Sequence, residues 1–443
     1  MLASKKEVNM YATREPFTNR SLLSLVRTAF NEHHKDRPKR YDIPTVDSLM
    51  SGLAVFSLKY PSLLQFEDDR QSEQTLRHNL RTLYGIHRAP CDTQMRTRLD
   101  GLGLEGIRKA GKHVINRLQR GKVLEQWKFM DNQYLLSLDG TGFFSSSAVH
   151  CDSCCEKHHK NGEVTYSHQM VVGSIVHPDM RQVLPIGFEP IIKSDGQEKN
   201  DCERNASKRW LEEFRQSHPK LSVIVVGDGL FSNGPFIDML EKHRCHYILV
   251  CQEKDHKYLY DWFWKAEAPD VTEFTEQVGK VQKRYRCMEN VPLNESRLEK
   301  LMNVIFYEEI DAKGVKRRWS WVTNLAVTKE NVRKIVQGGR ARWKIENETF
   351  NTLKNQGYNF EHNYGHGDKT LSNVLAGLML LAFLIDQCLE AVNLNFKQVL
   401  ERRRSRIRLW EDLRCAFRWF CVESWEALYA LILAPPQPIL QSA

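Results

Sequence analysis

The feature that most constrains the fold is a short apolar run, residues 134–144, which carries one acid, Asp139, beside two glycines. Apolar runs of this length that end near glycine are typical of buried strands. Glycine lets the backbone turn sharply or lie close to a ligand. Residues 223–229 repeat the arrangement, with Asp228 after four Val and Ile residues. Two such strands can bring both carboxylates to one edge of a sheet, where a divalent metal ion can bind.

Basic residues exceed acidic residues and are clustered along the chain. Lys and Arg number 64 against 55 Asp and Glu, a net charge of +9 over 443 residues. The clusters suit the phosphate backbone of a nucleic acid, and the alternative is an ordinary solvated positive surface. They lie at residues 37–40, 313–318, 340–344 and 402–408.

Cysteine usage and hydropathy indicate a reduced compartment. The eleven cysteines are an odd number in a long chain, and residues 1–17 do not resemble a secretory leader. We therefore expect a cytoplasmic protein. The longest apolar run, residues 374–385, is shorter than a membrane span requires, so we expect a buried helix and no membrane role.

The order of predicted elements indicates an α/β fold between two helical regions. After the strand with Asp139 we expect two strands that pair antiparallel with it, a helix, the strand before Asp228, a second helix and a fifth strand. This order is that of the ribonuclease H-like fold. The corresponding residues are 166–177, 182–192, 201–216, 223–227, 233–242 and 247–251. A β-rich segment follows, in which residues 304–309 and 315–323 flank a glycine-containing hairpin turn.

A third acid is expected on a helix near residue 346. In residues 339–354, helical spacing puts Arg342, Glu346, Phe350 and Leu353 on one face, whereas Glu348 points nearly opposite. We therefore take Glu346 as the third acid and expect Glu348 to face solvent.

The ordered acids resemble those of a known enzyme family. Asp139, Asp228 and Glu346, with Arg342 four residues before the Glu, resemble the DDE transposases of bacterial insertion sequences, most closely the IS-four-like group. That group inserts a β-rich domain before the Glu and carries the signature Tyr-x2-Arg-x3-Glu-x6-Lys. Gly339 stands at the Tyr position. Lys354 comes one residue late, which in a regular α-helix turns it about 100° aside. Residues 199–203 and 357–367 are also similar to segments of such transposases.

The resemblance implies a ribonuclease H-like mixed sheet flanked by helices, with a β-rich insertion and an N-terminal helical domain. The N-terminal region alone, with basic residues on its helices, reads as a DNA-binding domain or as a helical cap on the sheet. The basic, amphipathic tail fits a contact with DNA or a partner subunit, or a helix packed on the core. The expected divisions are an N-terminal arm and helical DNA-binding domain (1–130), the first part of the catalytic core (131–253), the β-rich insertion (254–325), the second part of the core with the Glu helix (326–395) and the tail (396–443).

The activity that the resemblance implies is cut-and-paste transposition. Asp139 would bridge two Mg²⁺ or Mn²⁺ ions, with Asp228 and Glu346 each binding one. The expected partner is double-stranded DNA, as transposon terminal inverted repeats and as target, bound by a homodimer at the nucleoid. Two alternatives remain: a ribonuclease H-like nuclease without strand transfer, and a non-catalytic DNA-binding regulator.

Several residues near the acids are candidate DNA contacts. Arg342 is expected to touch phosphate or to orient Glu346, and Trp343 is expected in the core. Either Trp319 or Trp321 can stack on a displaced base, the alternative being packing within a strand. Further expected contacts come from the late Lys of the signature and the basic cluster around it: Lys354, Arg340 and Lys344.

A cysteine- and histidine-rich loop follows the first strand. Cys151, Cys154, His158 and His168 form a candidate structural zinc site, because thiolate and imidazole favour Zn²⁺; the alternative is a set of reduced, unligated side chains. His366 and its neighbour His362 are interpreted as loop or DNA-backbone contacts. Asp201 and Glu203 are interpreted as acids that cap the start of a helix.

Overall fold

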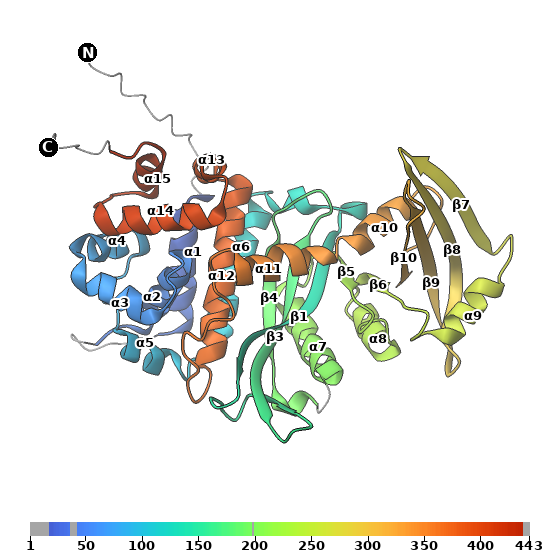
Figure 1. Ribbon diagram of the computed structural model, residues 1–443, viewed down its shortest axis with the longest axis horizontal. Helices are drawn as coiled ribbons and strands as arrows, with labels where there is room; N and C mark the ends of the chain where they lie inside the picture. Colours follow the sequence, from blue (N-terminus) through green and yellow to red (C-terminus); the bar gives the residue numbers. More distant parts are fainter. Residues whose placement is uncertain (1–16, 36–41, 197–198, 437–443) are drawn as a thin grey trace, which may run out of the picture.

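A long mixed β-sheet runs through the middle of the molecule and forms one of its ends (Figure 1). The computed structural model describes residues 17–35, 42–196 and 199–436, so the first part of the N-terminal arm and the 37–40 cluster lie outside the described residues. Within those ranges the strands are β1 (Tyr134–Ser146), β2 (Cys155–His158), β3 (Val164–Val176), β4 (Leu184–Ile191), β5 (Val223–Gly227), β6 (His246–Val250), β7 (Val271–Val278), β8 (Val281–Asn294), β9 (Arg297–Ile310) and β10 (Lys316–Thr323).

Five of these strands form the ribonuclease H-like core. β1 pairs antiparallel with β3 and parallel with β5, and β5 pairs parallel with β6. β4 pairs antiparallel with β3. The spatial order β4-β3-β1-β5-β6 confirms the predicted fold. One detail differs: β4 does not pair with β1, because β3 and β5 already occupy both edges of that strand.

The β-rich insertion continues the same sheet. β10 pairs antiparallel with the edge of β6, and β9, β8 and β7 follow outward, with α9 (Lys257–Lys265) packed on β8. The predicted hairpin joins β9 to β10. Gly314 there has a φ of 77°, and the Asp311 carboxylate accepts hydrogen bonds from the backbone N–H groups of Lys313 and Val315. Glycine tolerates this left-handed conformation without strain.

Helices cover both faces of the core strands. On one face Trp210 of α7 (Lys199–Ser217) lies against Gly173, and α8 (Gly234–Lys242) packs beside it. The opposite face carries α6 (Glu105–Arg120), α12 (Leu371–Val392) and a nearly continuous helical segment. That segment consists of α10 (Val332–Arg340), the π-helix η5 (Ile345–Phe350) and α11 (Asn351–Asn355). Ser174, which points opposite to Gly173 because side chains alternate along a strand, lies 3.5 Å from the Thr349 hydroxyl of η5.

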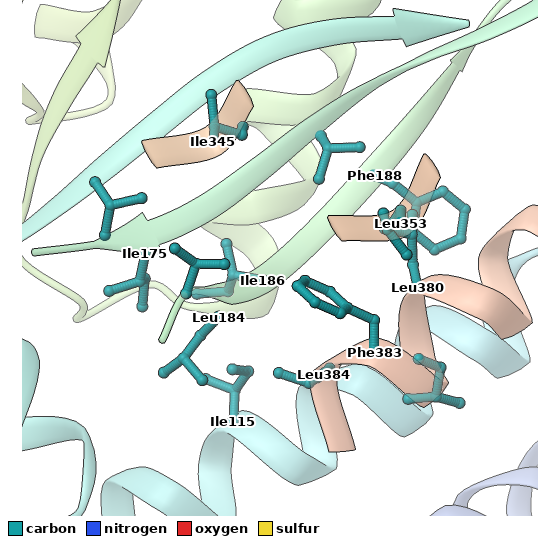
Figure 2. Packing of buried hydrophobic residues seen from close by; sticks show 14 of the residues in the cluster. Ile115, Ile175, Leu184, Ile186, Phe188, Ile345, Leu353, Leu380, Phe383 and Leu384 are labelled. Atoms are coloured by element: carbon teal, nitrogen blue, oxygen red, sulfur yellow. The ribbon is translucent and has the colours of Figure 1, made fainter. Parts of the chain in front are cut away.

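The core between this second layer and the sheet is densely apolar. Figure 2 shows side chains from β3, β4, α6, α12 and the η5–α11 segment meeting there, and these residues are buried. At about 25 cal/mol per Å² of buried apolar surface, such packing is the main force that holds the helices on the sheet. The labelled residues are Ile115, Ile175, Leu184, Ile186, Phe188, Ile345, Leu353, Leu380, Phe383 and Leu384.

The two ends of the described chain share one helical body (Figure 1). The Asn79 side chain in α4 donates hydrogen bonds to the carbonyls of Phe417 and Phe420, and the Tyr429 hydroxyl donates to Asn19. The C-terminal helices therefore pack on the core, and the division of this body into separate domains stays a prediction. Its members are α1 (Asn19–His33), α2 (Thr45–Ser57), α3 (Leu63–Ser72), α4 (Gln74–Tyr84), α5 (Asp92–Leu99), α13 (Leu394–Arg403), α14 (Arg406–Trp419) and α15 (Trp425–Leu433).

The helix at the centre of this body is α12. It contains the predicted apolar run and, at 22 residues, is long and apolar enough to cross a membrane by composition alone. The whole of its apolar window is buried inside the protein, as in the core helix of a soluble fold.

A buried ion pair ties α12 to the end of α2. The Lys59 ammonium lies 2.7 Å from the Asp386 carboxylate, which also accepts a 2.5 Å hydrogen bond from Tyr358. The ammonium lies over the rings of Tyr358 and Trp410, at 4.3 and 4.1 Å from their centroids. Burial lowers the pKa of Lys59, and the charge of Asp386 opposes that shift. The ammonium is therefore stabilised by this carboxylate, by two ring faces and by a 3.0 Å hydrogen bond that it donates to the Ser57 carbonyl.

We expect Asp386→Asn to destabilise the protein by about 3 kcal/mol, because removing one partner of a buried pair leaves an uncompensated charge. Urea denaturation followed by circular dichroism measures the change. Lys193→Gln, which breaks the exposed pair with Glu156, is the matched control and leaves the transition in place. A transition equally unchanged in Asp386→Asn would contradict this account of the pair.

Candidate active site

Asp139 and Asp228 meet at one end of the parallel pair β1 and β5. The last paired residues are Ser137 and Val226, and each acid follows two residues later along its strand direction. Asp228 leaves β5 directly, and one of its carboxylate oxygens accepts a 2.9 Å hydrogen bond from the backbone of Leu230. Equal offsets on adjacent parallel strands bring the two carboxylates to the same level of the sheet, as predicted.

β1 does not end at Asp139. It continues to Ser146, paired with β3, so Asp139 lies in the middle of a strand and Gly140 does not form a turn. The register shifts only later, between Gly142 and Phe144. Gly140 is instead explained by the close approach of another group, because a Cβ at this position would lie 2.7 Å from the Glu203 carboxyl carbon.

Glu346 reaches the same place from the helical layer. Arg342 is buried, and its guanidinium lies 2.7 Å from the Glu346 carboxylate and 3.6 Å from that of Asp139. The Ser137 hydroxyl donates a 3.2 Å hydrogen bond to the Arg342 carbonyl, which fixes this part of the helix over β1. Glu348 lies 3.5 Å from Arg181, but its side chain is 26% exposed against 36% for Glu346, so the prediction that Glu348 faces solvent is wrong.

The electrostatics of this site favour a cation. The pKa of Asp139 is raised to about 7, first by burial and then by the charge of Glu203; Glu346 and Asp228 add to the rise and Arg342 opposes it. Burial also raises the pKa of Asp228. The donor set consists of carboxylate oxygens, which hard divalent ions such as Mg²⁺ and Mn²⁺ prefer, and added positive charge would relieve the repulsion. The residues present therefore fit such ions.

Glu203 is a fourth acid that sequence reasoning assigned to a different role. Instead of capping α7 at the surface, Glu203 is buried and faces Gly140 and Asp139, whereas Asp201 is exposed beside Arg204. A signal was present in the sequence: Glu203 precedes the buried Ala206 and Trp210 by three and seven residues, so it lies on the apolar face of the helix.

The π-helix η5 corrects the expectation for Lys354. A π turn closes i→i+5 hydrogen bonds and so takes one residue more per turn than an α turn. Because η5 contains Glu346 and ends before Lys354, the wider turn absorbs the extra residue and returns Lys354 to the side of the helix that the family spacing gives. Lys354 is half-buried and pairs with Glu361 at 2.7 Å.

Gly339 departs from the family signature for a reason visible in the packing. A Cβ at Gly339 would lie 2.6 Å from the Trp321 indole, so that ring occupies the space of a side chain at this position. Trp321 is buried, which contradicts its prediction as a DNA contact and confirms strand packing. Trp319 is half-buried, stacked on Tyr307, with the Arg340 guanidinium 4.6 Å from its ring centroid.

The prediction that Trp343 lies in the core is wrong. Its side chain is 49% exposed and stacks on the Arg342 guanidinium, 4.4 Å from the ring centroid. It borders a groove of about 390 Å³, which Arg340 and Lys344 also line. Lys344 donates a 2.6 Å hydrogen bond to the Met180 carbonyl, and Arg340 pairs with Glu309 at 2.6 Å.

The cysteine–histidine loop forms a cluster that differs in one member from the predicted set. Cys151, Cys154 and His168 come together, and the fourth member is His366, with all candidate ligand atoms within 4.8 Å of one another. His158 is instead 72% exposed and lies beside Glu156. His366 is 198 residues from His168 in sequence, and its interpretation as a loop or DNA contact is replaced by this buried position.

The fold is an α/β core of the ribonuclease H-like type, and the comparisons name the family. The profile of the family described as "Transposase DDE domain" matches residues 145–384, more than half of the chain. The chain therefore belongs to the family of DDE transposases. Asp228 and Glu346 lie inside the matched range, and Asp139 precedes it by six residues.

Other comparisons add less. No curated protein matches the chain significantly. Among solved structures, a cryo-EM structure of a piggyBac transposase synaptic complex with hairpin DNA is similar over 96% of this chain and 81% of that one, at 9% identity and a TM-score of 0.38. The fold assignment therefore rests on the strand order and on the family match.

We expect Glu203→Gln to weaken Mn²⁺ binding about a hundredfold, because two unit charges roughly 5 Å apart interact by ~3 kcal/mol at an effective dielectric constant near 20 and each ~1.4 kcal/mol is a factor of ten. Isothermal titration calorimetry measures the affinity without requiring DNA. Asp201→Asn, which removes an exposed acid two positions earlier on the same helix, is the control and keeps the original affinity. If both variants bind Mn²⁺ with the same affinity, the charge of Glu203 does not contribute to metal binding.

Proposed function

We propose that the protein is a metal-dependent DNA transposase that cuts DNA at transposon ends and joins the freed 3′-OH to target DNA. The observation that carries this proposal is the meeting of Asp139, Asp228 and Glu346 on a ribonuclease H-like core, with Arg342 between two of them. Membership of the DDE transposase family supports the same activity.

The three acids would hold two Mg²⁺ or Mn²⁺ ions, Asp139 between both and Asp228 and Glu346 one each. When bound, such ions stabilise the charge that develops on the attacking and leaving oxygens of a phosphodiester. In the first step water attacks the scissile phosphorus, and the bond to the 3′ oxygen breaks, which leaves a 3′-OH and a 5′-phosphate. In the second step that 3′-OH attacks a target phosphorus and displaces a target 3′ oxygen.

The chain's own side chains position these reactants. Arg342 is locked by Glu346 and by its stack on Trp343, so its guanidinium can orient the acid and contact a phosphate without losing side-chain entropy. The groove beside it, lined by Arg340 and Lys344, supplies positive charge for the DNA backbone. Lys354, returned to the family position by the π turn, is a further phosphate contact.

The partners follow from the reaction. Double-stranded DNA is the substrate twice, as terminal inverted repeats and as target. Two transposon ends must be held together, which favours a homodimer in the DNA complex. We place this activity in the cytoplasm, at the nucleoid.

The decisive test uses DNA that carries the inverted repeats flanking the gene, with Mg²⁺ and a labelled target. Joined products are expected; cuts without joining would support a nuclease, and binding without cuts a regulator. Asp139→Asn and Glu346→Gln should reduce cleavage to background, because each removes a metal ligand, while DNA binding persists. Asp201→Asn, which changes an exposed acid outside the three, is the control and should cleave normally. Cleavage at normal rates by the first two variants would refute the site.

We expect Trp343→Ala to weaken binding of single-stranded or cut-end DNA about tenfold, since stacking of one base on an aromatic ring contributes roughly 1–3 kcal/mol. Fluorescence anisotropy measures the affinity. Trp343→Phe retains a ring face and should bind nearly as well as the original protein. If alanine and phenylalanine variants bind equally, Trp343 does not stack on DNA.

A further inference from the structure

We propose that Cys151, Cys154, His168 and His366 bind one structural zinc ion. The four side chains come from three separate segments: the connection that leads from β1 to β2, the middle of β3, and the loop between α11 and α12. Cys154, His168 and His366 are buried and Cys151 is half-buried. Residues so distant in sequence meet in one buried cluster that contains only thiols and imidazoles.

Five of the six distances between the ligand atoms match the edges of a zinc tetrahedron, and the sixth, from the Cys151 sulfur to the His366 nitrogen, is within 4.8 Å. With Zn–S near 2.3 Å and Zn–N near 2.0–2.1 Å, the edges are about 3.8 Å for S···S, about 3.6 Å for S···N and about 3.3 Å for N···N. The two sulfurs lie 3.9 Å apart, and the two Nε2 atoms 3.1 Å apart. The His168 nitrogen lies 3.6 and 3.5 Å from the sulfurs of Cys151 and Cys154, and the His366 nitrogen lies 3.3 Å from that of Cys154.

The hydrogen bonding of His366 also suits a metal. The Nδ1 of His366 donates to the Gly367 carbonyl at 2.7 Å, which leaves the Nε2 lone pair directed at the cluster. A second ring nitrogen held by a backbone carbonyl is the usual way in which proteins orient a metal-binding histidine.

Zinc fits this donor set better than the ions of the acid site. Two thiolates and two imidazoles in a closed tetrahedron are a common structural zinc set, whereas Mg²⁺ prefers carboxylate oxygens. The rival occupant of the same geometry is a disulfide between Cys151 and Cys154, but both cysteines are free thiols at 3.9 Å. Bridging them would require the sulfurs to move to ~2.05 Å, and neither histidine would then gain a partner.

The ion would clamp the active-site strand to the segment that follows the Glu helix. Phe143 stacks on His168, and Phe144 packs on His366 with ring centroids 4.6 Å apart. Both phenylalanines belong to β1, a few residues beyond Asp139. The loop that carries His366 begins directly after α11, so a metal there fixes the far end of the helical segment that carries Glu346. This role is independent of DNA chemistry.

The test is metal analysis of the full-length protein, purified without a histidine tag and without added chelator. One zinc per chain is expected by mass spectrometry, together with tetrahedral thiolate bands after replacement by Co²⁺. His366→Asn and Cys154→Ser should lower the zinc content at least tenfold. His158→Asn and Cys155→Ser, which change neighbouring exposed or half-buried residues outside the cluster, are matched controls and should keep a full complement.

Two results would overturn the proposal. The first is an unsubstituted protein that contains no zinc and gives an octahedral Co²⁺ spectrum. The second is a Cys151–Cys154 disulfide, found by peptide mapping of protein made in a reducing cytoplasm. The Co²⁺ spectrum is recorded on the original sequence, so it decides the question even where a variant fails to fold. Zinc present in protein that neither cuts nor joins DNA would refute the proposed function and leave this site intact.

Discussion

Repulsion among four closely placed carboxylates, one buried and three half-buried, is the constraint around which this protein is built. Asp139 is half-buried in the sheet; burial and the nearby Glu203, Glu346 and Asp228 raise its pKa to about 7, and Arg342 offsets part of that charge. Such an arrangement costs folding energy, and it is retained where a site must bind cations. Three features hold these acids together: the adjacent strands β1 and β5, the Arg342 guanidinium, and the close approach of Glu203 to Gly140.

Rigid elements supply the positions. Two acids lie at matching levels of adjacent parallel strands, and the third lies on a helix fixed over β1 by the Ser137 hydroxyl. The insertion does not form a separate lobe, because β10 pairs with the edge of β6 and continues the sheet. Any load on the insertion is therefore transmitted through backbone hydrogen bonds to the strand beside Asp228.

Local patterns predicted much of this structure, and contacts distant in sequence account for the rest. Runs of Val and Ile predicted the core strands, and the four-residue spacing from Arg342 predicted that Glu346 lies on the same side of the helix as Arg342. His366 was not, because only the folded loop after α11 brings it to His168. Trp343 was misplaced because a large apolar ring favours burial, whereas here it lies exposed against the Arg342 guanidinium. The amino-acid composition does not reveal the π turn. The sequence therefore predicts that Lys354 is turned away from the family position, although the π turn brings it back.

The shared helical body has a consequence for synthesis on the ribosome. Tyr84 of α4 packs against Phe417 and Trp425, and Asn79 binds carbonyls of the final helices. The first helices to emerge therefore cannot complete their core until the last ones are translated, hundreds of codons later. During that interval their apolar faces stay exposed and prone to aggregation, so the nascent chain is a natural client for chaperones until its two ends meet.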